Sequence, residues 1–101
     1  MPDYKEKGIT MDKVIFRKWP DGNVIALFPQ IVASVNGYLC QSYEHVGQHG
    51  AASPGIVRNT RPAIPKEYKE LKKELERIGY NPIVVKRFTY ADFLVRKSQY
   101  Q

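Results

Sequence analysis

The residues best suited to metal binding or catalysis lie in one nearly uncharged segment of the chain. Residues 23–57 carry a single formal charge, Glu44, although 26% of the chain is charged. The segment holds the only cysteine, Cys40, and both histidines, His45 and His49, while all 16 lysines and arginines lie outside it. Solvated loops normally carry charge, so a long neutral segment is either packed under other elements or shaped to hold a ligand. A functional site is therefore expected first in this segment.

His45 and His49 form an HxxxH pair, a spacing that brings two imidazoles to one face of a helix and suits a metal ion. Gly47 and Gly50 flank His49 and disfavour a helix at this point. The ordinary interpretation is that His45 ends a strand and that His49 lies in a loop. We expect no metal and no cofactor, and Cys40, His45 and His49 are the candidate ligands if a metal is bound.

Nucleophilic catalysis would need a serine or cysteine beside a histidine. Ser42 and His45 are three residues apart, so on a strand their side chains point to opposite faces. No nucleophile motif surrounds Cys40, which fits better as a small buried apolar residue. The sequence therefore favours a protein that is not an enzyme.

The glycine-rich run 47–55 allows a backbone to approach an anion closely, and Arg58 and Arg61 follow it. The run matches neither the P-loop nor the dinucleotide-binding fingerprint. The plainer alternative is a compact loop whose glycines set turns and whose arginines are solvated.

Aromatic residues are interleaved with basic ones in two further stretches, 16–19 and 86–90. Proteins that hold single-stranded nucleic acid stack bases on aromatic rings and contact phosphates with lysine and arginine. An open sheet face would present such a platform, whereas strand aromatics are more often core. The residues predicted to bind nucleic acid or another anion are Arg17, Lys18, Trp19, Arg58, Arg61, Lys86 and Arg87.

The hydrophobic pattern predicts the elements that position these residues. Residues 13–19 and 24–28 are expected to form a hairpin, with Gly22 at positive φ in the turn and Pro29 ending the second strand. Residues 38–45 are expected to form a third strand, followed by an irregular segment over 46–65.

An amphipathic helix is predicted over 66–78, because its apolar residues fall on one stripe. A fourth strand is predicted over 81–88, and residues 90–97 form either a short helix or an edge strand. The order β-β-β-α-β predicts an α+β domain, a small, mainly antiparallel sheet with one amphipathic helix packed on one face in two layers. We expect a flexible leader over 1–12, a single domain over 13–89 and a C-terminal tail over 90–101.

The formal charge of +6 and the pI near 9.5 favour an acidic partner, nucleic acid first. The excess is dispersed along the chain, which solubility explains equally well. No signal peptide and no apolar run of the roughly 20 residues that span a bilayer are present. A single cysteine excludes an internal disulfide, so the sequence favours a cytoplasmic protein that does not bind a membrane.

The runs KVIFRKWPDGNVIALFP and GYLCQSYEHVGQHGAASPG, the TRPA at 60–63 and a helix ending in IGY resemble small uncharacterised proteins of bacteriophages and bacterial mobile elements. The resemblance covers about residues 13–88. No activity is established for that group, so it carries over no site residue. It implies a phage or host cytoplasm, where small proteins often bind host factors or nucleic acid.

Three hypotheses follow. The first is a basic binding module that engages nucleic acid. The second is a protein-interaction or assembly factor that binds a phage or host protein. Its contact surface would be the neutral segment 41–55. Its contact residues would be Tyr43, His45, Gln48, His49 and Ser53. The third is a metal-binding or hydrolytic enzyme.

Overall fold

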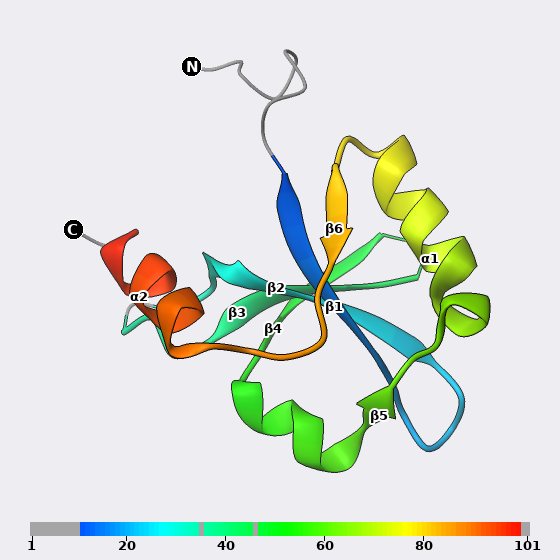
Figure 1. Ribbon diagram of the computed structural model, residues 1–101, viewed down its shortest axis with the longest axis horizontal. Coiled ribbons are helices and arrows are strands. Elements are labelled where there is room, and N and C mark those ends of the chain that lie inside the picture. The colour runs from blue at the N-terminus through cyan, green and yellow to red at the C-terminus, as the bar shows by residue number, and fades with distance from the viewer. Residues whose placement is uncertain (1–10, 35, 46, 100–101) are drawn as a thin grey trace.

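The computed structural model describes residues 11–34, 36–45 and 47–99 and shows an α+β fold with a small sheet (Figure 1). Within these residues the strands run in the order β4-β3-β2-β1-β5, and β6 pairs with β1. The elements in chain order are β1 (Asp12–Lys18), β2 (Val24–Val32), β3 (Cys40–Glu44), β4 (Gln48–Ala52), the 3-10 helix η1 (Pro54–Asn59), β5 (Arg61–Pro62), α1 (Pro65–Arg77), β6 (Pro82–Val84) and α2 (Tyr90–Ser98).

All strand pairings are antiparallel except that of β6 with β1, which is parallel. The predicted fold class, α+β with a mainly antiparallel sheet, is confirmed. Most of the predicted leader, residues 1–10, lies outside the described residues, and Asp12 already belongs to β1. No helix in the described part of the chain is long and apolar enough to cross a bilayer.

The β1–β2 hairpin forms as predicted. Its turn is closed by a hydrogen bond from Trp19 N to Asn23 O at 2.8 Å, and Asp21 Oδ1 accepts from Asn23 N at 3.0 Å. Gly22 has φ +98°, a conformation that only glycine adopts at no steric cost. The turn chemistry of these residues therefore fixes the register of the two central strands.

The prediction that Pro29 ends the second strand is wrong. β2 continues to Val32, and its register with β3 shifts between Phe28 and Val32. A proline is tolerated at such a bulge because the ladder needs no N–H from it there.

The prediction of an irregular segment over 46–65 is also wrong. β4 pairs with β3 through five residues, η1 follows, and β5 pairs with the end of β1. β4 reads Gln-His-Gly-Ala-Ala, which has low intrinsic strand preference. Pairing with β3 therefore decides its conformation, a tertiary effect that local sequence does not report.

Helix α1 covers one face of the sheet, and the predicted helix is confirmed to within one residue at each end. It begins at Pro65, where a missing N–H costs nothing, and Glu67 Oε1 accepts from Ile64 N at 3.0 Å. Leu71 and Leu75 are buried, and burial of each contributes about 1.5–3 kcal/mol. They form one core with Val14, Phe16, Ala26, Phe28 and Tyr43.

The opposite face of the sheet is covered as well, so the expectation of an open face is wrong. Ile56 of η1 and the residues Val85 and Phe88, which follow β6, pack against it. The predicted strand over 81–88 shortens to β6 for this reason, since its second half leaves the sheet and crosses this face. The second core consists of Ile15, Ile25, Leu27, Cys40 and Ala52.

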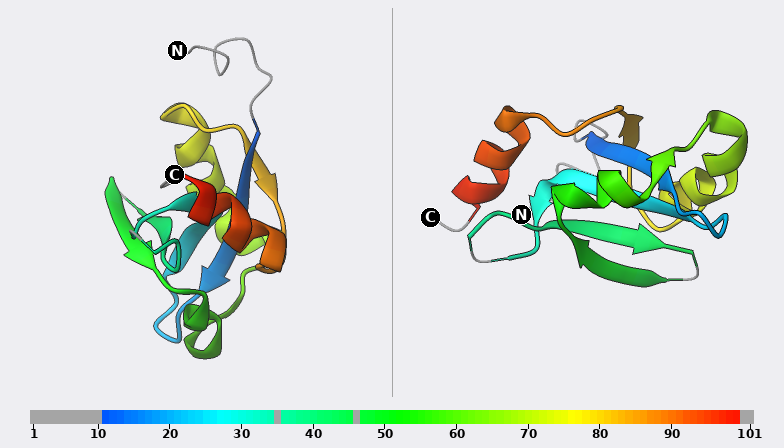
Figure 2. Two further views of the ribbon diagram at one scale, coloured as in Figure 1. Left: turned by 90° about the vertical axis from the view of Figure 1, so that its left-hand side faces the viewer. Right: turned by 90° about the horizontal axis from the view of Figure 1, so that it is seen from below.

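Helix α2, the helix alternative for residues 90–97, packs against the bulged end of β2 (Figure 2). Arg96 of this helix and Gln99, its C-cap residue, satisfy backbone groups at the bulge. Arg96, 2% exposed, donates to Pro29 O at 2.5 Å. Gln99 donates to Gln30 O and accepts from Val32 N, both at 2.8 Å. The helix thus completes the hydrogen bonding of the sheet.

Gly37 lets α2 come close to the β2–β3 connection. It has φ +78°, and a Cβ built there would lie 2.9 Å from Lys97 Cα. Its carbonyl also accepts from Arg96 Nε at 2.8 Å. Any larger residue at this position would push α2 away from the sheet.

Candidate nucleic-acid interface

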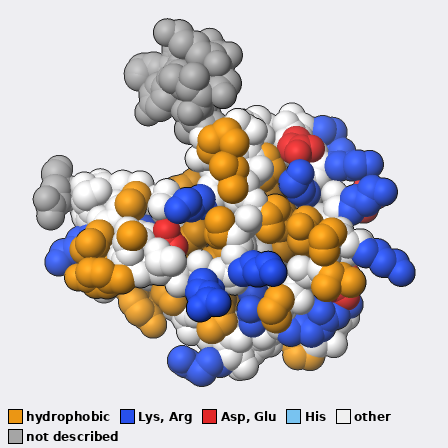
Figure 3. All heavy atoms as spheres, viewed as in Figure 1, with side chains coloured by type: hydrophobic (Ala, Val, Ile, Leu, Met, Phe, Trp, Pro, Cys, Tyr) orange, Lys and Arg blue, Asp and Glu red, His pale blue; other side chains and the backbone are white. Residues whose placement is uncertain are grey.

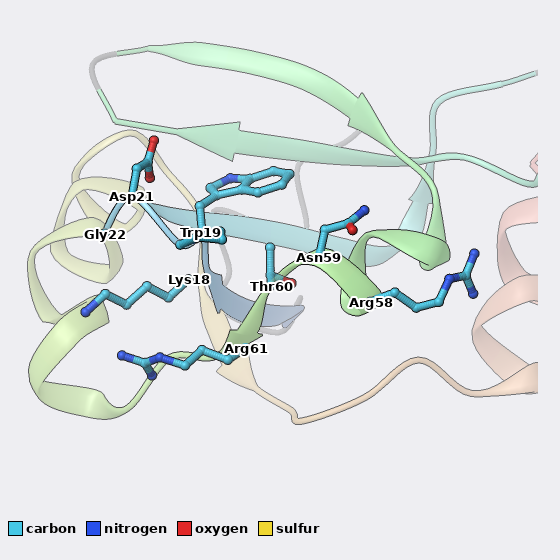
Figure 4. A pocket seen from close by; sticks show the side chains of 9 residues that line it. Lys18, Trp19, Asp21, Gly22, Arg58, Asn59, Thr60 and Arg61 are labelled. Atoms are coloured by element: carbon cyan, nitrogen blue, oxygen red, sulfur yellow. The ribbon is translucent and has the colours of Figure 1, made fainter.

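Four of the seven residues predicted to bind an anion come together at the end of β1. Lys18, Trp19, Arg58 and Arg61 line a surface hollow of about 850 Å³ (Figure 4). The antiparallel pairing of β1 with β5 sets Lys18 opposite Arg61. In Figure 4 these two side chains extend together toward the start of α1, Arg58 points the other way, and Trp19 lies between them.

Arg17 does not belong to this group because it is buried beneath η1. Its Nη2 donates to Val57 O at 2.9 Å and to Thr60 O at 2.6 Å, and its Nε donates to Thr60 Oγ1 at 3.0 Å. Burial lowers the pKa of the guanidinium. Arg17 therefore holds η1 on the sheet and, through η1, positions Arg58.

Glu67 of α1 holds the other two cations in place. Lys18 Nζ lies 2.7 Å from Glu67 Oε2, and Arg61 makes a bidentate contact of 2.6 and 3.1 Å with the same carboxylate. The hydrogen bonds from Arg61 and then Lys18 lower the pKa of Glu67 to about 2. Asp21 also lines the hollow, so its three cations, Lys18, Arg58 and Arg61, exceed the two carboxylates around it by one charge.

Trp19 is the aromatic member of the site. It is half-buried, packs against the second core and lines a neighbouring hollow of about 570 Å³ between β4 and η1. Its ring lies between the β3–β4 hairpin and η1 in Figure 4. A ring held firmly by apolar contacts and partly open to solvent suits stacking of one base.

Lys86 and Arg87, the remaining predicted residues, are exposed on the segment after β6. Lys86 lines a separate hollow of about 380 Å³ together with Tyr68. On the face drawn in Figure 3, lysine and arginine side chains gather over η1, β5 and the segment after β6. These two residues thus extend the basic surface without entering the Trp19 hollow.

Most of the neutral segment 41–55 forms the β3–β4 hairpin rather than a loop. The polar side chains of Tyr43 and His45 contact helix α1. Tyr43 is 1% exposed, and its hydroxyl donates to Glu74 Oε2 and accepts from Gly47 N at 2.9 Å. His45 Nδ1 lies 2.6 Å from Glu74 Oε1. The hydrogen bond to Glu74, with burial, raises the pKa of the Tyr43 phenol. These groups lock the hairpin to the helix.

The other residues predicted for this contact surface are more accessible. His49 packs edge-on against the Tyr43 ring with centroids 4.7 Å apart, and its Nε2 lies 3.4 Å from the Tyr80 hydroxyl. Gln48 is exposed and Ser53 is half-buried, and both line the hollow between β4 and η1.

The candidate metal ligands are divided by the sheet. The register places His49 opposite Tyr43 on the α1 side, whereas Cys40 is buried in the second core on the other side. Burial raises the pKa of the Cys40 thiol to about 11. In the described part of the chain no three histidine, cysteine or acidic side chains gather as metal ligands would. Neither a thiolate nucleophile nor a ligand set formed by these residues is supported.

Sequence reasoning missed the two carboxylates of α1 that organise both regions. Glu74 had a usable signal, because it adjoins the buried stripe formed by Leu71 and Leu75, and a carboxylate in that place needs a partner. Glu67 had no such signal, since its partners Lys18 and Arg61 lie on two strands outside its helix. In comparisons with known proteins the chain matches no protein family, no curated protein and no solved structure.

Proposed function

We propose that this protein is a nucleic-acid-binding module that holds a single strand at the Trp19 hollow. The observation that carries the proposal is the position of Trp19, a half-buried indole between Arg58 on one side and Lys18 with Arg61 on the other. A base stacks on the ring while the flanking phosphates contact the cations. The charge of +6 attracts the strand over longer distances.

Trp19 also provides the assay, because it is the only tryptophan of the chain. Titration with an unlabelled eight-nucleotide single strand is expected to quench its fluorescence at low and at physiological salt. An abasic strand of the same length carries the phosphates without the bases and is expected to bind without quenching. Equal quenching by both strands, or none by either, would contradict base stacking on Trp19.

Paired variants separate this site from general charge. Arg58→Ala with Arg61→Ala is expected to weaken binding about tenfold or more and to reduce the salt slope by about two, one for each lost phosphate contact. The control is Lys73→Ala with Arg77→Ala, which removes the same charge from the exposed side of α1. An equal loss in the control would show that only net charge matters.

The carboxylate in the hollow gives a test in the opposite direction. Glu67→Gln frees Lys18 and Arg61 from their shared partner and is expected to strengthen binding about threefold, roughly the effect of one added surface charge. Glu70→Gln makes the same change at an exposed position of the same helix and is expected to have a smaller effect. Anisotropy of a labelled strand measures both.

A further inference from the structure

β4 is an open edge of the sheet. Among the described residues it pairs only with β3, and Gln48 to Ala51 are exposed. Both views of Figure 2 show the β3–β4 hairpin at the outside of the molecule. Every second residue of an edge strand directs its N–H and C=O away from the sheet, where another strand can pair with them.

Natural edge strands are usually protected by lysine, proline, an inward charge or a bulge. β4 has none of these features, since it reads Gln-His-Gly-Ala-Ala and its register with β3 is continuous. The chain has 16 lysines and arginines, yet it places none in this strand. An unprotected edge in so basic a chain is the pattern expected of a docking edge.

A hollow lies on each face of the sheet beside this edge. On the α1 side a hollow of about 590 Å³ is lined by Tyr43, His49, Ile78 and Tyr80. On the other side the hollow of about 570 Å³ extends from Gly50 to Arg58, and Trp19 and Glu44 line it as well. Consecutive side chains of an added strand point to opposite faces, so alternate residues would enter the two hollows in turn.

These features identify the occupant. Self-pairing of two copies about Gly50 would set only Gln48, His49, Ala51 and Ala52 of the second copy beside the hollows, and none of them can fill the aromatic one. Two copies would also each bring a charge of +6. A foreign strand with a large apolar residue on one face suits the aromatic hollow, and acidic residues on its other face suit Arg58 and the net charge of the chain, with Glu44 as the one carboxylate beside them.

We propose that β4 binds an extended, acidic segment of a partner protein as an added strand of the sheet. An apolar side chain of that segment occupies the hollow between Tyr43 and Tyr80, and a neighbouring acidic side chain faces Arg58. The main-chain hydrogen bonds supply affinity and the two hollows supply selectivity. The edge and the aromatic hollow lie outside the Trp19 site, whereas the second hollow shares Trp19 and Arg58 with it.

The test uses the full chain and a synthetic peptide of four Leu-Glu repeats with a fluorescent label. The matched peptide has N-methyl groups on the four leucine nitrogens, which removes hydrogen-bond donors and keeps the side chains. We expect the parent peptide to bind about tenfold or more tightly than the methylated one, and more tightly than four Leu-Lys repeats. Amide hydrogen exchange is expected to slow at residues 48–52.

Ala51→Lys protects the edge without changing a buried residue and is expected to abolish peptide binding while the melting temperature stays unchanged. The matched control, Ala91→Lys, adds the same charge at an exposed position of α2 and is expected to leave binding intact. Equal binding of the methylated peptide, or no change in exchange over 48–52, would overturn the proposal. A dimer that protects the same amides without peptide would overturn it in favour of a second copy.

Discussion

Helix α1 presents one carboxylate to each of two hairpins, with different results. Near the end of the β1–β2 hairpin Glu67 bonds two permanent cations, Lys18 and Arg61 of β5, and with Arg58 and Asp21 counted the hollow keeps one positive charge. At the β3–β4 hairpin Glu74 bonds the Tyr43 hydroxyl and the His45 imidazole. The first arrangement leaves charge for a ligand, whereas the second consumes its polar groups in holding the fold together. Residue type alone therefore does not distinguish a binding site from a structural contact. The groups that each carboxylate bonds make the difference.

The largest expected effect tests the structural side of this comparison. Tyr43→Ala removes a fully buried ring and is expected to lower the free energy of unfolding by about 3–5 kcal/mol. Tyr43→Phe keeps the ring but leaves Glu74 without its phenol, and is expected to cost about 1–3 kcal/mol. Trp19→Leu, at the half-buried site position, is expected to cost only about 1 kcal/mol. Urea unfolding measures all three variants. An equal loss of stability in Tyr43→Ala and Trp19→Leu would contradict the distinction between a structural residue and a site residue.

Two neighbouring arginines sharpen the comparison further. Arg17→Met leaves Val57 O and Thr60 O without their donor and is expected to lower the free energy of unfolding by about 1–3 kcal/mol. Arg58→Met, at an exposed position, is expected to stay within about 0.5 kcal/mol of the parent protein. Denaturant titration of both variants checks this order, and its reversal would make Arg58 the structural residue.

The smallest effect concerns pH. The folded pKa of Glu67 is lowered to about 2, so its ion pairs stabilise the fold above the ordinary carboxylate pKa. This contribution is present at neutral pH and is lost as pH falls from about 4.5 toward 2, where the folded protein also takes up the proton. Stability measured over this range is expected to fall less steeply in Glu67→Gln than in the parent. Parallel curves of stability against pH would show that the ion pairs of Glu67 contribute nothing to the free energy of unfolding.

Local chemistry allowed the β1–β2 hairpin and α1 to be predicted, because turn residues and a helical stripe act over short distances. β4 could not be predicted, since its small residues become a strand only by pairing with β3. Lys18, Trp19, Arg58 and Arg61 were four of the seven residues predicted to bind an anion, from two separate patterns, and the structure brings these four to one hollow. The structural role of Arg17 could not be predicted, because its acceptors lie about 40 residues away in sequence.

The buried Arg96 has a consequence for how the chain folds as it is synthesised. Its two acceptors, Gly37 O and Pro29 O, precede it by 59 and 67 residues. At about 5–20 residues per second, a ribosome needs roughly 3–13 s to add the intervening chain. During that time water must solvate both carbonyls, and the bulged end of β2 lacks its permanent donor. Docking of α2 is therefore a late event in folding, and the bulged end of β2 stays exposed until it occurs.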